Sequence, residues 1–257
     1  MGGILGGRLA DLLLARMGKQ DDNHRMDGRA YRGRSKLAVL LGEQVWKHVA
    51  GRTVLDFGCG DGHEAVELSQ HGAARVIGLD IQQPALEAAR RHARTSGEHE
   101  RCTFTSSSQE QVDVIIAIDS FEHFSDPAAV LRQMATLLAP AGSVFISFGP
   151  TWYHPLGGHL FSVFPWAHLV FTERALIRWR STFKHDGATR FAEVAGGLNQ
   201  MTIRQFMRLV RQSPLQFAEF ETRPIRRLRW LHSRLTREFT TATVRCRLVR
   251  RELKAGG

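Results

Sequence analysis

The chain has 257 residues, of which 43% are hydrophobic, and it carries a formal net charge of +10 at pH 7. This length and apolar content predict one α/β domain with additions rather than two domains. The three cysteines have no paired spacing, which excludes a disulfide framework and a cysteine metal set. The composition therefore favours a reducing, cytoplasmic setting and predicts no metal site.

Two segments precede the first predicted strand. The stretch ILGGRLADLLLARMG (4–18) is apolar, but Arg8, Asp11 and Arg16 interrupt it, so we expect neither a cleavable signal nor a membrane-spanning segment there. The second segment, 31–51, carries apolar residues at helical spacing: Leu37, Leu40, Leu41, Val45 and Val49. This spacing predicts one helix that packs on a sheet.

The sequence VLDFGCGDG (54–62) joins a predicted strand to a predicted helix through a glycine turn. Val54, Leu55 and Phe57 suit a buried parallel strand, and the glycines remove side chains that would keep a ligand away from the backbone. HEAVELSQHG follows with helical spacing, so free N–H groups gather where the turn enters the helix. This arrangement predicts a cradle for a nucleotide-type ligand.

Two common kinds of nucleotide cradle fit this turn poorly. A triphosphate-binding loop needs Lys and then Ser or Thr after its last glycine, where this chain has His63 and Glu64. The dinucleotide fingerprint places two residues between its second and third glycines, whereas only Asp61 separates Gly60 from Gly62. A purely structural glycine turn is the third alternative, and the next strand weighs against it.

That next strand, RVIGLDI (75–81), ends in Asp80, twenty residues after Gly60. A carboxylate at the tip of the second strand of a βαβ unit can accept both hydroxyls of a ribose. Asp80 is therefore the predicted ribose-binding residue. The alternative is a helix N-cap, because QPALEAARRHAR begins soon afterwards, although Gln82 intervenes.

Strands and helices alternate along the rest of the core, which predicts a parallel sheet. The predicted strands are 52–57, 75–80, 102–106, 112–118 and 143–148. The predicted helices are 63–71, 84–95 and 127–139, the last with Asp126 as its N-cap. A helix at 202–213 begins with a capping box of Thr202 and Gln205, and strands at 216–222 and 239–249 end the chain through a hairpin-like connection.

Three motifs in this order, VLDFGCGDG, GLDI (78–81) and VDVIIAIDSFEHF (112–124), resemble the class I S-adenosylmethionine-dependent methyltransferases that act on small molecules. The resemblance is close over residues 50–150 and looser outside them. It implies a Rossmann-like seven-stranded, mostly parallel sheet with flanking helices and an insertion after the fifth strand. It also implies S-adenosylmethionine as the cofactor and a small molecule as the methyl acceptor.

The resemblance assigns cofactor contacts to particular residues. Those that it places at the methionine part are Asp56 and the backbone of Gly58, Cys59, Gly60 and Gly62. It places Asp80 at the ribose hydroxyls, Ile81 beside the adenine, and Asp119 where methionine meets the acceptor. The acid that usually bonds the adenine amine in this family is missing here. Ser108 or Gln109 is expected to hydrogen-bond the adenine instead, and as a neutral group it would form a weaker bond than a carboxylate.

The fifth strand and the 202–213 helix are separated by roughly fifty residues, far more than a usual connection. The first part, 151–171, has no Asp, Glu, Lys or Arg. Its aromatic residues and histidines are Trp152, Tyr153, Phe161, Phe164, Trp166, Phe171, His154, His159 and His168. Apolar walls with a few ring nitrogens predict a lid over the acceptor, and the alternative is a small separate core with incidental histidines.

Methyl transfer to a hydroxyl requires a group that removes the proton, and histidine suits this role. The candidates are His123 in FEHF, beside the cofactor edge, and His159 in GGHLF, where glycines allow close approach. Glu122 could orient one of them or pair with a cationic acceptor. The alternative for His123 is an architectural role, because the resembling family carries it with different acceptors.

Residues 223–254 hold eleven Lys or Arg residues against Glu238 and Glu252. Such a basic end could attract RNA, an anionic membrane surface or an acidic acceptor, or could be only a solvated face. The chain lacks the Asn/Asp-Pro-Pro-aromatic signature of base N-methylation after the fourth strand, and it lacks a Pro-Cys nucleophile. The sequence thus predicts methyl transfer to a small, partly apolar acceptor, with an RNA-binding or RNA-modifying protein and a cofactor binder without turnover as alternatives.

Overall fold

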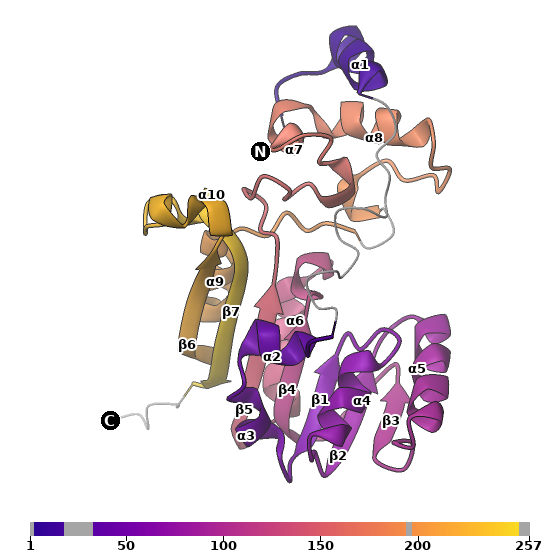
Figure 1. Ribbon diagram of the computed structural model, residues 1–257, viewed down its shortest axis with the longest axis vertical. Coiled ribbons are helices and arrows are strands. Elements are labelled where there is room, and N and C mark those ends of the chain that lie inside the picture. The colour runs from indigo at the N-terminus through magenta and orange to yellow at the C-terminus, as the bar shows by residue number, and fades with distance from the viewer. Residues whose placement is uncertain (1–2, 18–32, 194–196, 252–257) are drawn as a thin grey trace.

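The computed structural model describes residues 3–17, 33–193 and 197–251, in which a seven-stranded sheet is flanked by helices (Figure 1). The strands are β1 Thr53–Phe57, β2 Arg75–Leu79, β3 Cys102–Thr105, β4 Val112–Ile118, β5 Leu138–Phe148, β6 Leu215–Pro224 and β7 Thr241–Arg250. Their order is β3-β2-β1-β4-β5-β7-β6, and only β7 runs antiparallel to its neighbours. This confirms the predicted mostly parallel sheet, and β5 begins at Leu138 instead of 143.

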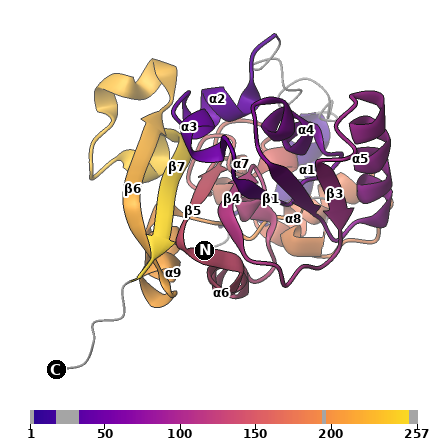
Figure 2. The ribbon, with the colours of Figure 1, turned by 90° about the horizontal axis from the view of Figure 1, so that it is seen from below.

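Helices cover both faces of the sheet, as a parallel arrangement requires. One face packs against α6 (Pro127–Leu137) and α9 (Ile203–Gln212), and the other against α4 (His63–Gln70) and α5 (Gln83–Thr95) (Figures 1 and 2). The bounds of these four helices lie within two residues of the predicted ones. The Asp126 cap and the Thr202–Gln205 capping box are confirmed, because their side chains accept bonds from the Ala129 and Gln205 amides.

The single helix predicted over 31–51 is wrong. Within the described part of this segment, the chain forms α2 (Lys36–Leu41) and then α3 (Val45–Val49), separated at Gly42. Gly42 has a φ of 85°, a left-handed value that interrupts a right-handed helix and favours glycine. The apolar face survives the break, because Leu37, Leu40, Val45 and Val49 are all buried in the same core as α4 and α5.

The N-terminal helix and the insertion form a cap with a core of its own. Helix α1 (Gly7–Arg16) packs against α8 (Glu173–Ser181), and Asp11 pairs with Arg178 at 2.9 Å. Leu5 forms an isolated bridge with Phe171, next to α7 (Ala167–Val170). Among the aromatic residues predicted to wall a pocket, Trp152, Phe161 and Phe171 instead belong to this buried core.

The cap lies beyond the edge of the sheet where β4 and β5 end (Figure 1). The segment that leads from the cap to α9 is bound to this edge, because the Asn199 side-chain amide donates to the carbonyl oxygens of Phe121 and Phe124 at 2.8 and 3.0 Å. Carboxyl ends of parallel strands are where open α/β sheets bind their ligands. The insertion is therefore placed beside the ligand-binding edge. No helix in the described ranges is long and apolar enough to cross a membrane.

Candidate active site

The glycine turn after β1 has left-handed backbone at Gly58, Gly60 and Gly62, with φ values of 85°, 49° and 81°. A Cβ on Gly58 or Gly62 would press on neighbouring protein, at 3.0 Å from the Cβ of Ser120 and 2.8 Å from that of Ala89. A Cβ on Gly60 would meet nothing within 4 Å. Gly58 and Gly62 are therefore needed for packing as well as conformation, and Gly60 faces the open side of the turn.

The first of two carboxyl groups beside this turn is that of Asp56, at the end of β1. Asp56 is only 3% exposed, and its Oδ2 atom has no hydrogen-bond partner among the described residues. Burial, followed by the nearby charge of Glu64, raises the pKa of Asp56 well above its usual range. Cys59 is also buried within the turn. An unpartnered buried oxygen of this kind is rare in a folded protein and suits a group that a ligand will satisfy.

Asp80 lies just after β2 and holds the turn from the other side. Its Oδ2 atom accepts from the Gly60 amide and its Oδ1 atom from the Gln82 amide, each at 2.9 Å. The N-cap of α5 is Gln82, so the alternative of Asp80 as an N-cap is wrong. Ile81 is 88% exposed, which is unusual for a large apolar side chain and leaves its surface open to a ligand.

The loop after β3 adjoins Asp80, because the Asp80 amide donates to the carbonyl of Thr105 at 3.2 Å. In this loop the Ser108 hydroxyl accepts from the amide of Glu110 at 3.2 Å, so its own proton is free to be donated elsewhere. Gln109 is exposed. The expected adenine contacts of Ser108 and Gln109 stay predictions that this geometry allows.

Lys36, on α2, joins this site although the sequence did not single it out. Its Nζ atom lies 3.0 Å from Glu64, in the first turn of α4, and 3.2 Å from Asp119, after β4. Burial lowers the pKa of Lys36, but the two carboxylates outweigh burial and raise it overall. Burial raises the pKa of Asp119, and Lys36 opposes this effect. The only sequence signal for Lys36 was Ser35, which caps α2 through the Ala38 amide.

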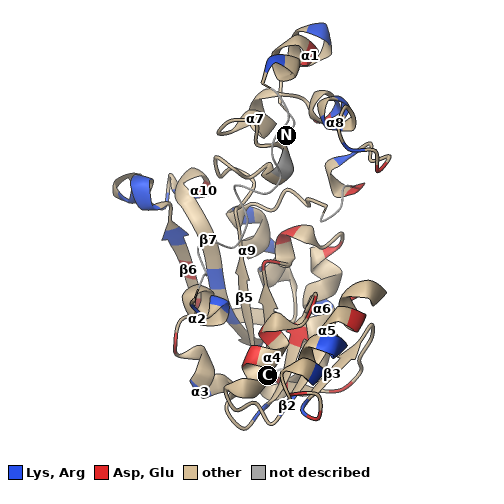
Figure 3. Ribbon diagram, turned by 45° about the vertical axis from the view of Figure 1, so that its right-hand side comes forward, with Lys and Arg blue, Asp and Glu red and all other residues tan. Residues whose placement is uncertain are grey.

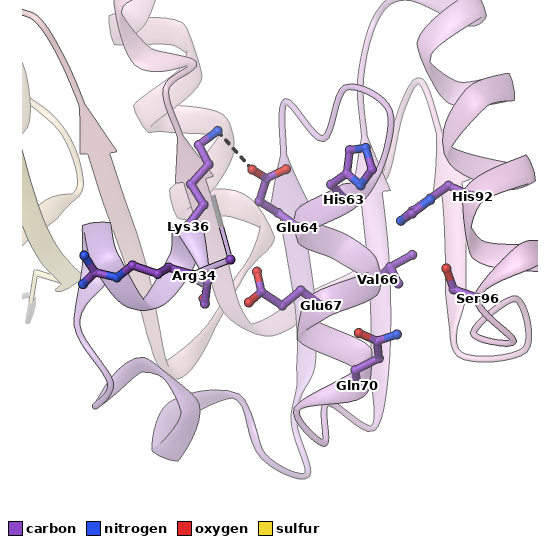
Figure 4. A pocket seen from close by; sticks show the side chains of 11 residues that line it. Arg34, Lys36, His63, Glu64, Val66, Glu67, Gln70, His92 and Ser96 are labelled. Carbon is purple, nitrogen blue, oxygen red and sulfur yellow. Dashed lines mark ion pairs between the residues drawn. The ribbon is translucent and has the colours of Figure 1, made fainter. Parts of the chain in front are cut away.

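A cleft of about 700 Å³ opens beside the cradle, between the loop at 33–36, α4 and α5. Figure 4 shows the Lys36–Glu64 ion pair at one side of this cleft and His92 and Ser96 at the other. Asp56, Gly60 and Asp80 do not line it. The cleft therefore lies beside the cradle, and Lys36 and Glu64 belong both to its lining and to the candidate site.

The two predicted bases lie together. The rings of His123, after β4, and His159, in the insertion, are 5.5 Å apart with an edge-to-face angle of 75°. The Nδ1 atom of His123 lies 2.7 Å from the Gly197 carbonyl oxygen, which can only accept, so Nδ1 carries the proton in the neutral ring. This leaves the Nε2 lone pair available. Burial, followed by His123, lowers the pKa of His159 to about 4.

The other two histidines of the insertion have structural partners. His154 Nδ1 accepts from the Leu156 amide at 2.9 Å and so closes a local turn. His168 is fully buried, with its Nε2 atom 2.6 Å from the Trp152 carbonyl and its ring packed under Gly158. The alternative of incidental histidines therefore describes His154 and His168, whereas His159 remains beside His123.

Glu122, between Asp119 and His123, is only 4% exposed. Its Oε1 atom lies 3.4 Å from the Gly149 amide, and Oε2 has no partner among the described residues. Burial, followed by the charge of Asp119, raises the pKa of Glu122 from 4.5 to about 8. Below the lower value both folded and unfolded chains hold the proton. As pH rises between the two values only the unfolded chain releases it, so stability falls.

We expect Glu122→Gln to remove this pH dependence, because glutamine does not titrate. Relative to the parent, the variant should gain stability as pH rises from about 5 to about 9, by on the order of a few kcal/mol. Urea unfolding at the two pH values measures the difference. Glu87→Gln, on the exposed side of α5, is the control. Equal shifts for both variants would show that burial of Glu122 is not the cause.

A mostly parallel sheet with a glycine turn after β1 and a carboxylate after β2 defines an α/β protein that holds a nucleoside-type cofactor at its strand ends. The family described as a methyltransferase domain matches residues 10–213, which is most of the chain. This chain therefore belongs to the class I S-adenosylmethionine-dependent methyltransferase family. Of the residues that the structure describes, no group of three or more His, Cys, Asp or Glu side chains could hold a metal ion.

Curated relatives match a little over a third of the chain. The ubiquinone biosynthesis O-methyltransferase of Stutzerimonas stutzeri (strain A1501) is 38% identical over 105 residues, which are 38% of this chain and 45% of the relative. The protein with the same name from Aeromonas salmonicida (strain A449) is 39% identical over 103 residues, 38% of this chain and 43% of the relative. The aligned part thus covers less than half of these relatives.

Solved structures agree on the fold. The magnesium protoporphyrin IX methyltransferase from Synechocystis PCC 6803 with bound SAH has a TM-score of 0.53 and 17% identity, over 83% of this chain and 80% of that chain. An S-adenosylmethionine dependent methyltransferase from Mesorhizobium loti has a TM-score of 0.51 and 18% identity, over 79% and 93%. At these identities the comparison shows the fold alone.

Proposed function

We propose that this protein transfers a methyl group from S-adenosylmethionine to a hydroxyl group of a small, partly apolar acceptor. The observation that carries the proposal is the contact between two histidine rings, His123 in the segment after β4 and His159 in the insertion, whose centroids lie 5.5 Å apart. When bound, the cofactor supplies an activated methyl group. The protein must then hold the acceptor in line and take its proton.

The residues around the glycine turn fit the cofactor. Asp80 has acceptor capacity left on its carboxylate for the ribose hydroxyls, and the exposed surface of Ile81 suits one face of adenine. Lys36, which pairs with Glu64 and Asp119 beside the turn, would pair with the methionine carboxylate. The carboxylates of Glu64 and Asp119, which now share Lys36, would remain for the methionine ammonium.

His123 is the better candidate for the base. Its Nδ1–H bond to Gly197 fixes the tautomer, so the Nε2 lone pair is ready to accept a proton from an acceptor hydroxyl. The low pKa of His159 makes that ring a weak base and suits it to packing against His123. The segment that carries His123 is held in place by its backbone, because the Glu122 carbonyl accepts from the Asn199 amide at 3.0 Å.

Two observations favour a small acceptor with a hydroxyl group. The relatives are named as O-methyltransferases, which supports oxygen as the acceptor atom. In the cap, Phe164 and Trp166 are only partly buried, so they retain apolar surface beyond the cap core. Incubation with labelled S-adenosylmethionine and cell extract, followed by mass identification of the labelled product, tests the proposal. Label found only in RNA or protein would contradict it.

The RNA-modifying alternative has one observation in its favour, the exposed arginines between β6 and β7. The segment DSFEHF after β4 weighs against it, because it lacks the signature of base N-methylation. Labelling of purified RNA by the chain would distinguish this alternative from turnover of a small molecule.

The cap aromatics allow a further test of the acceptor side. Phe164→Ala and Trp166→Ala should mainly raise the KM for the acceptor, by about tenfold, because each removes apolar contact made in ground and transition states alike. Phe183→Ala is the matched control, since Phe183 is a partly buried cap aromatic that packs on Trp179 at 5.0 Å. An unchanged KM in the first two variants, with kcat also unchanged, would make the insertion a structural addition.

A further inference from the structure

The connection between β6 and β7, residues 225–240, exposes large apolar side chains on the protein surface. We call this segment the β6–β7 turn; it contains the short helices η5 (Arg226–Leu231) and α10 (Arg237–Thr240). Trp230 is 77% exposed and Leu235 is 88% exposed, and Leu231 and Phe239 are exposed as well. A cluster of exposed large apolar residues in one segment marks a contact surface more often than isolated ones do.

Hydrogen bonds fix the β6–β7 turn in this exposed position. The His232 ring bonds to the hydroxyl of Thr222, on β6, at 3.0 Å and to the hydroxyl of Thr240, within the turn, at 2.8 Å, and so ties the turn to the end of β6. The Ile225 amide donates to the Thr240 carbonyl at 2.8 Å and closes the base of the turn. The exposed apolar side chains therefore belong to a hydrogen-bonded, ordered turn.

The exposed charged side chains of the turn are all arginines. Arg226, Arg227, Arg229 and Arg234 are exposed, and none of them forms an ion pair within the described ranges of the chain. The single acid of the turn, Glu238, is buried and accepts from the Ile203 and Arg204 amides at the start of α9. No carboxylate within the turn therefore offsets its exposed arginines.

Arginines on the neighbouring strands are different, because they have partners. Arg247 pairs with Glu219 at 2.8 Å, Arg245 pairs with Glu221, and Arg250 donates to the Leu138 carbonyl. The basic end predicted from the sequence thus divides into two parts. The strand arginines stabilise the sheet, whereas those of the turn are available to an anionic partner. Figure 3 shows in blue where the basic residues lie along the strands and the turn.

The turn lies at the same edge of the sheet as the cofactor cradle. Strand β6 runs parallel to β5, since each is antiparallel to β7, so the chain leaves both strands at one edge. Phe239 of the turn contacts Tyr153 of the insertion, with ring centroids 5.2 Å apart. The turn is therefore next to the cap that covers the candidate active site (Figure 1).

We propose that the β6–β7 turn binds an anionic lipid surface, with Trp230 and Leu235 entering the headgroup region and the arginines contacting lipid phosphates. Trp with its amphipathic ring prefers this interfacial depth, and clustered arginines are attracted to anionic leaflets. An RNA surface would use the arginines but would leave Leu235 without a function. This binding goes beyond the proposed methyl transfer and requires no turnover.

The test is sedimentation of the full chain with vesicles of phosphatidylcholine containing about one third phosphatidylglycerol. Arg226→Gln/Arg227→Gln/Arg229→Gln should lower the partition coefficient about a hundredfold, at roughly fivefold for each arginine. Trp230→Ser/Leu235→Ser should lower it at least about tenfold. Pure phosphatidylcholine should bind the parent chain weakly. All substituted residues are exposed, so unchanged cofactor affinity verifies that each variant is folded.

The matched control removes the same charge elsewhere. Arg132→Gln/Arg208→Gln/Arg211→Gln, on the exposed faces of α6 and α9, should change the partition coefficient less than about twofold. An equal loss in this control would show a general charge effect and overturn the proposal. Parent-like binding by Trp230→Ser/Leu235→Ser would also overturn it. So would retention on RNA tighter than on the vesicles, because the turn would then be a nucleic-acid surface.

Discussion

Asp80→Ala is expected to lower the affinity for S-adenosylmethionine by a hundredfold or more. Hydrogen bonds to a charged group contribute about 1.5–3 kcal/mol each, and the variant would lose the acceptors for two ribose hydroxyls. It would also release the Gly60 and Gln82 amides that Asp80 now holds at 2.9 Å, which loosens the turn itself. Titration calorimetry with S-adenosylmethionine or its demethylated product measures the effect.

Two further variants separate ribose binding from damage to the turn. Asp80→Asn keeps one acceptor oxygen and the size of the side chain, so it should lose less affinity than Asp80→Ala.

Gly60→Val should abolish binding, because its side chain would occupy the open side of the turn. Gly97→Val is its matched control: Gly97 has a φ of 75° and equally open surroundings, but lies after α5, away from the cradle. Unchanged affinity in folded Asp80→Ala or Gly60→Val would refute the cofactor site.

His123→Ala is expected to lower kcat for a hydroxyl acceptor by about a hundredfold or more, with little change in cofactor affinity. Removal of a positioned general base typically costs this factor, and His123 is the ring whose free nitrogen is fixed by a carbonyl partner. Steady-state rates with the identified acceptor, at saturating cofactor, provide the measurement. A folded variant with a parent-like kcat would remove His123 from proton transfer.

His159→Phe is the companion variant, because phenylalanine preserves the edge contact with His123 but has no ring nitrogen. The proposal expects a small effect on kcat from this change. A hundredfold loss in His159→Phe together with a near-normal His123→Ala would assign the base to His159 instead. Comparable large losses in both would indicate that the two rings act as one unit, which the double variant would reveal by non-additivity.

Local sequence patterns predicted most of the secondary structure in the cofactor-binding part of the chain. The strands around residues 54–118 and the helices between them were predictable because a buried parallel strand and an amphipathic helix each impose a short-range spacing on apolar residues. The glycine turn and Asp80 were predictable for a related reason. Their chemistry depends on residues within one βαβ unit, so their spacing along the chain reflects their spacing in space.

The break at Gly42 shows where such patterns fail. Apolar residues on both sides of it keep helical spacing, so periodicity alone predicts one helix, although the chain turns at the left-handed glycine. In the insertion, aromatic content alone could not distinguish a pocket wall from a core. The decision depended on α1, more than a hundred residues earlier, which packs on α8 and adds Ala10 and Leu14 to the buried core that contains Trp152 and Phe161.

The sequence by itself thus determined the mostly parallel sheet, and it predicted the cofactor cradle and the candidate bases, because local spacing and residue chemistry indicate them. Only the tertiary structure brought Lys36 to Glu64 and Asp119, and placed His159 against His123. It also divided the basic end into strand arginines with partners and turn arginines without ion pairs among the described residues. Contacts between distant segments depend on how helices and strands pack, and no spacing along the chain encodes them.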